Sequence, residues 1–257
     1  MPALSEIASH LDDLLRIAEI PDYPNAINGV QVEHDRPITR VAAAVDARER
    51  TIRGAIDAGA DLLLVHHGLF WGGLQPLRGG TLRRVHALLA APLAVYSAHL
   101  PLDAHPELGN NVLLAQELGL VPSGGFARHQ TIDIGVSGED SVPTRDLIER
   151  ADAFARHYGG SARHSPAEPG RITRRWAICT GAGASRDTLD EAADRGIDTL
   201  IVGEGPHWTS IDADELGITI IYAGHYATET LGVRALAEYV SRAFDVPWLF
   251  VDVPTGL

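Results

Sequence analysis

The stretch RVAAAVDARERTIRGAIDAGADLLLVHHG (residues 40–68) contains the pattern that decides the fold. Its apolar run at 40–45 predicts a strand, and the following segment predicts a helix that ends at a glycine. A second apolar run at 61–65 predicts another strand. A strand, a crossover helix and a second strand form the unit from which parallel sheets are built.

The same alternation recurs along the chain. Further strands are predicted at 92–97, 175–180, 198–203 and 218–224. Further helices are predicted at 4–19, 106–119, 185–196 and 227–244. Because the strands are continuously apolar, both faces of the sheet should be covered, which gives an α/β architecture. No internal repeat is visible in the sequence.

One segment breaks this rhythm. The segment VPSGGFARHQTIDIGVS (121–137) begins as a Pro/Gly/Ser loop and then alternates apolar and polar residues. We therefore expect a domain boundary there, with a second α/β domain after it.

The composition narrows the classes of function. The 257 residues include 21 Lys+Arg and 34 Asp+Glu, and the formal net charge of −13 disfavours nucleic acid and anionic membranes as partners. No run of 18 apolar residues and no signal-peptide pattern is present, and Cys179 is the single cysteine, so we expect a cytoplasmic protein without a disulfide. The feature that needs an explanation is the presence of 12 histidines in an acidic chain.

Histidines and carboxylates follow four of the predicted strands. In open α/β sheets, ligands bind beyond the carboxyl ends of the strands. The residues found there are His66 and His67, His99 and Asp103, Glu204 and His207, and His225 and Glu229.

Imidazole and carboxylate are ligands for Zn, Fe, Mn, Co and Ni, and the sequence does not choose among these metals. The spacing of His225 and Glu229 puts both on one face of a helix. His66 and His67 can diverge onto two metals, which Asp103 could bridge. These five residues predict a site with two divalent ions, about 3.5 to 4 Å apart, of a kind that activates water.

Each motif also has a plainer interpretation. A lone His-His pair is more often structural, and a helical His-x-x-x-Glu pair is common on surfaces. Asp103 could instead cap the helix that begins near Pro106. The GAGAS segment (181–185) could hold an anion, but it lacks the phosphate-loop lysine, so a tight turn is the simpler interpretation. The metal hypothesis depends on the motifs occurring together at successive strand ends.

Five motifs, in order along nearly the whole chain, are similar to a known family. They are NGVQVE (28–33), DLLLVHHGLFW (61–71), HLPLDAHPELGNN (99–111), VGEGPHW (202–208) and GHYATETLGV (224–233). The chain resembles the dinuclear-metal, hexameric-toroid family whose members often carry the name GTP cyclohydrolase 1 type 2.

The resemblance implies that the metal ligands are His66, His67, Asp103, His225 and Glu229, with His99, Glu204 and His207 lining the cleft. It also implies two α/β domains. Their expected ranges are 1–122 with 222–257 for a discontinuous metal-binding domain, and 123–221 for the second. Members assemble as a trimer of dimers around a cavity, so a homohexamer is expected here. Gly68 and Leu100 depart from the family's usual proline and threonine.

The main functional hypothesis is a metal-dependent hydrolase in which His99, Glu204 or His207 moves the proton. A small molecule, with a nucleotide such as GTP among the candidates, would be the substrate. The alternative is a non-catalytic metal-binding or regulatory toroidal assembly. DNA binding inside a ring is disfavoured by the net charge.

Overall fold

The structure is a computed structural model that describes residues 1–257, and it confirms the mixed α/β architecture. The chain divides into two compact units. Unit 1 comprises residues 1–105 and 232–253, and unit 2 comprises residues 106–231 and 254–257. No helix combines the length and apolar character that crossing a bilayer requires.

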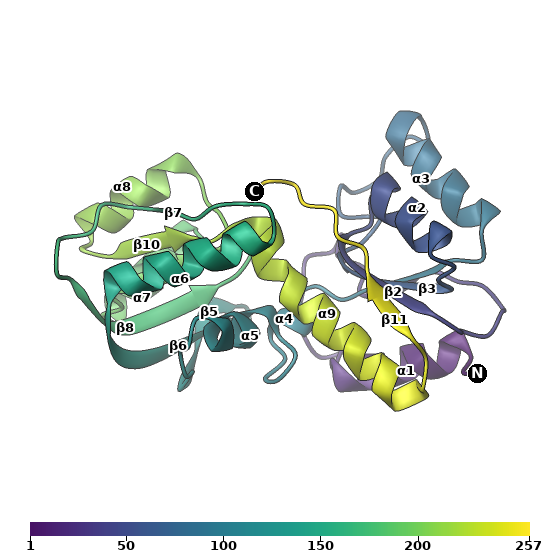
Figure 1. The fold of residues 1–257 in the computed structure, drawn as a ribbon, viewed down its shortest axis with the longest axis horizontal. Helices are drawn as coiled ribbons and strands as arrows, with labels where there is room; N and C mark the ends of the chain where they lie inside the picture. The colour runs from purple at the N-terminus through teal and green to yellow at the C-terminus, as the bar shows by residue number, and fades with distance from the viewer. The chain divides into compact units, whose positions relative to one another are not determined.

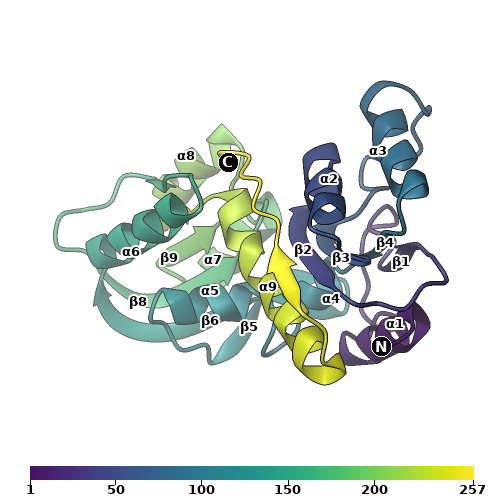
Figure 2. The same ribbon diagram turned by 45° about the vertical axis from the view of Figure 1, so that its right-hand side comes forward.

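Unit 1 contains a five-stranded sheet in the order β1-β4-β3-β2-β11. Its strands are β1 (Gly29–Val32), β2 (Val41–Asp46), β3 (Leu62–His67), β4 (Ala94–Ser97) and β11 (Trp248–Phe250). All are parallel except β1, which pairs antiparallel with β4 at the edge. Figure 2 shows β2, β3, β4 and β1 side by side.

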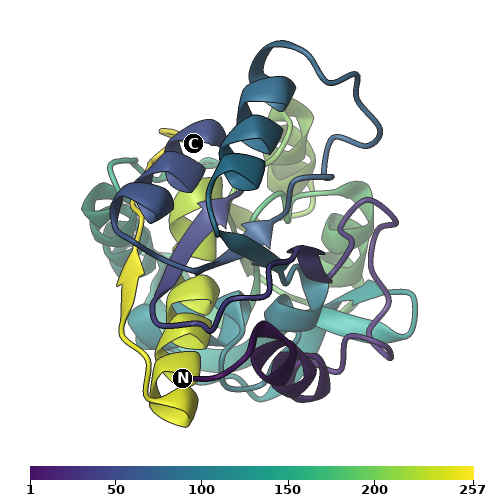
Figure 3. The same cartoon turned by 90° about the vertical axis from the view of Figure 1, so that its right-hand side faces the viewer.

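Helices cover both faces of this sheet. They are α1 (Leu4–Leu14), α2 (Glu49–Asp57), α3 (Gly79–Ala90), the short α4 (Leu100–Asp103) and the end of α9 (His225–Phe244). In Figures 1 and 3, α2 and α3 lie on one side of the sheet, and α1 and the end of α9 lie on the other. Every residue from Val41 to Val45 is buried, as a strand covered on both faces requires.

Unit 2 contains a six-stranded mixed sheet in the order β5-β6-β8-β9-β10-β7. Its strands are β5 (Gly124–His129), β6 (Ile132–Pro143), β7 (Arg163–His164), β8 (Ile172–Cys179), β9 (Thr199–Val202) and β10 (Thr219–Tyr222). Its helices are α5 (Asn110–Glu117), α6 (Thr144–His157), α7 (Arg186–Asp194), α8 (His207–Glu215) and the first turns of α9. Strands β8, β9 and β10 are parallel.

Alternate residues of β8 enter two different cores in unit 2. Ala177 and Cys179 pack with the apolar side chains of α7 and α8, while Trp176 and Ile178 pack with those of α5 and α6. This alternation is the period-2 geometry of a strand covered on both faces. Cys179 is therefore a buried core residue.

The units divide at different places from those expected. The expected first domain included residues 106–122, 222–231 and 254–257, whereas these segments belong to unit 2. The reason for the first two is that α5 packs on β6 and β8, and that Ala223 and Leu231 pack in a core of unit 2. Which core a helix joins depends on the whole fold, which local sequence does not reveal.

The two units repeat one local pattern, although no repeat is visible in the sequence. The segments β2–α2–β3 and β8–α7–β9 each hold two parallel strands, and the connecting helix ends at a glycine with positive φ, Gly59 (68°) or Gly196 (63°). Two residues after each glycine lies an aspartate, Asp61 or Asp198. Its Oδ2 accepts a hydrogen bond from a backbone N–H of the neighbouring parallel segment, at 3.1 Å for Asp61 and at 2.9 Å for Asp198. The edge strands also correspond. β1 runs antiparallel to β4, the neighbour of β3, and β7 runs antiparallel to β10, the neighbour of β9.

Candidate metal centre

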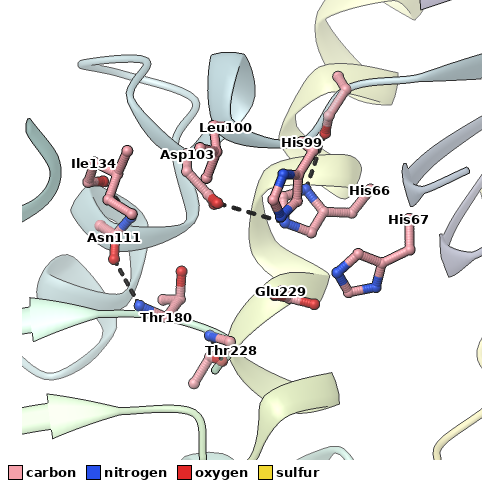
Figure 4. Close-up of polar contacts among 12 residues, drawn as sticks. His66, His67, His99, Leu100, Asp103, Asn111, Ile134, Thr180, Thr228 and Glu229 are labelled. Carbon is pink, nitrogen blue, oxygen red and sulfur yellow. Dashed lines mark hydrogen bonds and ion pairs between the residues drawn. The ribbon is translucent and has the colours of Figure 1, made fainter. Parts of the chain in front are cut away.

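Three imidazoles of unit 1 converge at the carboxyl ends of β3 and β4. His66 and His67 are the last residues of β3, and His99 follows β4 as the residue that precedes α4. The strands are adjacent and parallel, with Val65 opposite Ser97, so their ends meet at one edge of the sheet. One ring nitrogen from each of the three histidines lies within 4.8 Å of the others. Figure 4 shows the three rings close together.

Asp103 joins this group from the end of α4. Its Oδ2 lies 3.5 Å from Nε2 of His66, and both side chains are buried. Asp103 lies four residues after His99, and residues four apart lie on one face of a helix. The short helix α4 therefore places Asp103 beside the histidines. Asp103 also lies inside α4 rather than at the start of α5, so it does not cap the next long helix.

The Nδ1 atom of each histidine in the group is held by an acceptor. His66 Nδ1 lies 2.9 Å from the carbonyl oxygen of Ala98. His67 Nδ1 lies 3.0 Å from Asp46 Oδ1, and His99 Nδ1 lies 2.8 Å from Asp22 Oδ1. Carbonyl and carboxylate oxygens only accept, so Nδ1 donates its proton and the neutral ring keeps its lone pair on Nε2. This is how proteins orient histidines that bind metal.

The donor set fits a divalent ion. With the lone pair of His66 on Nε2, two electron donors, Nε2 and Asp103 Oδ2, face each other at 3.5 Å in a buried place. Such a pair needs a proton or a cation between its members. Nitrogen and carboxylate donors without thiolates suit zinc, iron, manganese, cobalt and nickel.

A second cluster lies in unit 2. His225 begins α9, and its Nε2 lies 3.1 Å from Oε2 of Glu229, one turn further along the same helix. Its Nδ1 lies 2.7 Å from Oε1 of Glu204, which follows β9. Burial lowers the pKa of His225, but the hydrogen bonds and charges of Glu229 and Glu204 outweigh this effect and raise the pKa to about 9. Without a metal, the ring is an imidazolium between two carboxylates.

The glycines of the GAGAS segment make room for this cluster. Gly181 has a φ of 62°, and a β-carbon there would collide with Oε1 of Glu229. The backbone N–H of Gly181 donates to Thr228 Oγ1 at 3.1 Å, which ties the segment to α9. The segment is therefore a tight turn packed against Glu229, in line with the simpler interpretation of the sequence.

Asn111 fixes the same end of the unit 2 sheet. Its Nδ2 donates to the carbonyl of Ile134 at 2.7 Å, and its Oδ1 accepts from the N–H of Thr180 at 2.8 Å. Figure 4 draws the bond to Thr180 as a dashed line. The asparagine belongs to the GNN segment of the sequence, whose role was not apparent there.

The sequence-predicted residues therefore fall into two groups and one exception. His66, His67, His99 and Asp103 are together in unit 1, and Glu204, His225 and Glu229 are together in unit 2. His207 begins α8, its side chain is exposed, and it takes no part in the second group. The roles assigned to these residues stay predictions.

Sequence reasoning missed the residues that hold His99 in place. Oδ2 of Asp22 accepts from the N–H of Leu100 at 2.9 Å and from Asn28 Nδ2 at 2.8 Å. Asn28 Oδ1 accepts from the N–H of His99 at 2.8 Å. Burial raises the pKa of Asp22, but its bonds to His99 and Asn28 outweigh burial and hold the pKa below the usual value. Burial lowers the pKa of His99.

Gln31 explains the rest of the NGVQ segment. Its Oε1 accepts from the N–H of Leu69 at 2.7 Å, and its Nε2 donates to the carbonyls of Ala26 and Ile27 at 3.0 and 2.9 Å. A β-carbon at Gly68 would collide with this side chain. Gly68, which stands where the resembled family usually has proline, therefore leaves room for Gln31. Only the cluster of polar residues at 22–31 could have hinted at this network.

Comparison with known proteins identifies the family. The sequence model of the family described as Duf34/NIF3 (NGG1p interacting factor 3) matches residues 2–255. The chain belongs to the Duf34/NIF3 family. A Deinococcus radiodurans relative named GTP cyclohydrolase 1 type 2 homolog is 41% identical to this NIF3-family chain, over 98% of the chain and 94% of the relative. An Escherichia coli relative of the same name is 37% identical over 97% of the chain and 98% of the relative.

Solved structures agree with the two-domain fold of this NIF3-family protein. A structure titled protein ybgI, unknown function, superposes with a TM-score of 0.88 at 35% identity, covering 99% of this chain and all (100%) of the other. TTHA1606 from Thermus thermophilus superposes with a TM-score of 0.85 at 35% identity and the same coverage. The relatives' names make an enzyme of this class a candidate.

Proposed function

We propose that this NIF3-family protein is a dinuclear metal-dependent hydrolase. In this proposal two divalent ions per chain are bound by His66, His67, Asp103, His225 and Glu229. The observation that carries it is the anchoring of Nδ1 in His66, His67 and His225 by carbonyl or carboxylate oxygens, which leaves Nε2 of each ring available as a metal ligand. The family resemblance supports the use of both clusters in one centre.

Divalent ions in such a centre would supply Lewis-acid activation of water at neutral pH. The chain's own contribution is proton transfer, and His99 is the best-supported residue for it. Asp22 fixes its ring at Nδ1, and burial lowers its pKa, so a neutral Nε2 is ready to accept a proton. Glu204 holds His225 in place, and the exposed His207 is the weaker candidate for the proton shuttle.

The proposed substrate is a small molecule with a hydrolysable C–N bond. The relatives' names favour GTP, whose purine imidazole ring would be opened at C8 with release of formate. We further propose a homohexameric toroid, as the family resemblance implies, in the cytoplasm, as the single cysteine suggests.

The test combines metal analysis with a formate assay. Purified protein should contain close to two metal ions per chain by elemental analysis and should release formate from GTP. Stoichiometric metal without turnover of GTP or of a hydrolase substrate panel would reject the hydrolase. Light scattering should give six times the 27.5 kDa chain mass.

A non-catalytic, metal-binding or regulatory assembly is the second candidate. It is favoured by the burial of His66, His67, His99 and Asp103, since each exposes less than a tenth of its surface. A metal held so deeply would exchange slowly. Retention of metal through prolonged dialysis, together with no turnover, would support this candidate.

A further inference from the structure

Two aromatic side chains stand directly against the imidazoles of unit 1. The ring centroid of Trp71 lies 4.4 Å from that of His99 and 5.1 Å from that of His67. The ring of Tyr23 lies 6.1 Å from His99 and 6.2 Å from Trp71. All four belong to unit 1, so this arrangement does not depend on unit 2.

The two aromatic side chains are partly exposed to solvent, whereas the imidazoles beside them are buried. Trp71 is 37% exposed and Tyr23 is 54% exposed, whereas His99 is 7% exposed. Tryptophan and tyrosine gain much buried apolar area when a partner covers them, so their exposed surface here is available to a ligand. Their open surfaces border the buried cluster, so a molecule that contacts them also lies near the reacting end of the histidines.

The backbone near both aromatic residues is held by one side chain. Gln31 ties the segment after Tyr23 to the segment before Trp71, through its bonds to Ala26, Ile27 and Leu69. Backbone segments fixed in this way place the two rings before a ligand arrives. A preorganised site loses less entropy on binding than a mobile one.

We propose that Trp71 and Tyr23 form a stacking site for a planar heteroaromatic ring of the substrate. Aromatic faces stack on planar rings whatever the ring's hydrogen-bonding groups. The two residues thus select for a flat ring, while the recognition of particular atoms on it is left to other groups. The proposal rests on the proposed function in one respect, namely that the imidazole cluster is the reaction centre.

The test measures binding, not turnover. Isothermal titration calorimetry of the purified protein compares guanosine 5′-monophosphate with ribose 5-phosphate, which differ by the planar base, and adds benzimidazole as a ring alone. The variants are Trp71→Leu, which removes the aromatic face, and Trp71→Phe, which restores one. Trp208→Leu is the matched control, because Trp208 is also 37% exposed and lies in unit 2.

The nucleotide and benzimidazole should bind the wild type and Trp208→Leu, and ribose 5-phosphate should bind at least about tenfold more weakly than the nucleotide. Trp71→Leu should weaken binding of the two rings about tenfold or more without changing bound metal, and Trp71→Phe should recover most of it. Equal binding of the nucleotide and the sugar phosphate, or unchanged ring binding in Trp71→Leu, would overturn the proposal. A protein that binds the rings but hydrolyses nothing would reject the hydrolase and leave the stacking site standing.

Discussion

Asp22 accepts a hydrogen bond from Nδ1 of His99 at 2.8 Å, although 77 residues separate the two in the chain. The same carboxylate accepts from the N–H groups of Tyr23 and Leu100 and from the side chain of Asn28. Four donors thus surround one buried carboxylate. The loop before β1 thereby sets both the position and the tautomer of a histidine that follows β4.

Asp22→Asn should reverse the tautomer of His99. Apart from His99, which can change its tautomer, two N–H donors face Oδ2 and only that of Tyr23 faces Oδ1, so the amide oxygen should stay at Oδ2 and the NH₂ should face His99 Nδ1, which must then accept. The proton would move to Nε2. Imidazole nitrogen NMR should show this shift, and turnover should fall about 10- to 100-fold. Asp35→Asn, at an exposed position, is the control and should change neither.

His66→Ala and Asp103→Ala should each remove bound metal while leaving the fold largely intact. Both side chains lie at the end of the sheet rather than in its apolar core, and both are donors of the same cluster. Elemental analysis and circular dichroism measure the two effects. His86→Ala, on α3 and away from the cluster, should keep its full metal content. Wild-type metal content in His66→Ala would show that the ligand assignment is wrong.

Gly181→Ala and Gly170→Ala form a matched pair. Both glycines have positive φ (62° and 78°), but a β-carbon would collide with Glu229 at position 181 and would meet nothing within 4 Å at position 170. Gly170→Ala should lower the free energy of unfolding by about 1 to 2 kcal/mol, because alanine is strained in the left-handed conformation. Gly181→Ala should lower it by more and should also displace Glu229. Urea unfolding of metal-free protein, with metal content measured separately, checks both; equal destabilisation would contradict the packing argument.

Tyr96 should limit stability in alkali. Its hydroxyl donates to Asp12 Oδ1 at 2.8 Å, and burial, together with that bond and the charge of Asp12, raises the pKa of Tyr96 well above 10. The folded state therefore keeps its proton where the unfolded state loses it. This contribution is complete below about pH 10 and declines as the pH rises from there toward the folded pKa.

Tyr96→Phe should flatten that alkaline decline. It should also lower stability near neutral pH by about 1 kcal/mol, because the hydrogen bond is lost. Urea unfolding from pH 8 to 11 measures both effects. An alkaline decline as steep as that of the wild type would show that Tyr96 does not cause it.

Local sequence pattern was enough to predict β2, β3, β4, β8, β9 and β10 and the histidines at their ends, but not β1, β5, β7 or β11. The apolar runs around 41–45 and 62–65 are buried parallel strands, and the histidines after β3 and β4 converge because parallel strands end at one edge. Residues such as His66 and His99 could be found in this way because their place in the fold is set by the strand that carries or precedes them.

Other parts of the site depend on contacts between distant segments. Asp22, Asn28 and Gln31 lie in a stretch without a regular pattern, and only the folded chain brings them to His99 and Leu69. The placement of α5 in the second unit likewise depends on its packing against β6 and β8. Periodicity carries no information about either relationship.

The repeated strand–helix–strand pattern means that one backbone framework serves two purposes in this chain. At the end of β3 the framework carries His66 and His67, and after the corresponding β9 it carries Gly203 and Glu204. The hydrogen-bonded turns at Asp61 and Asp198 keep the two frameworks alike. The main chain therefore sets the positions of the residues at the strand ends, and the side chains of those few residues set their chemical role. Substitutions at those ends could change the chemistry of either unit without rebuilding the fold beneath it.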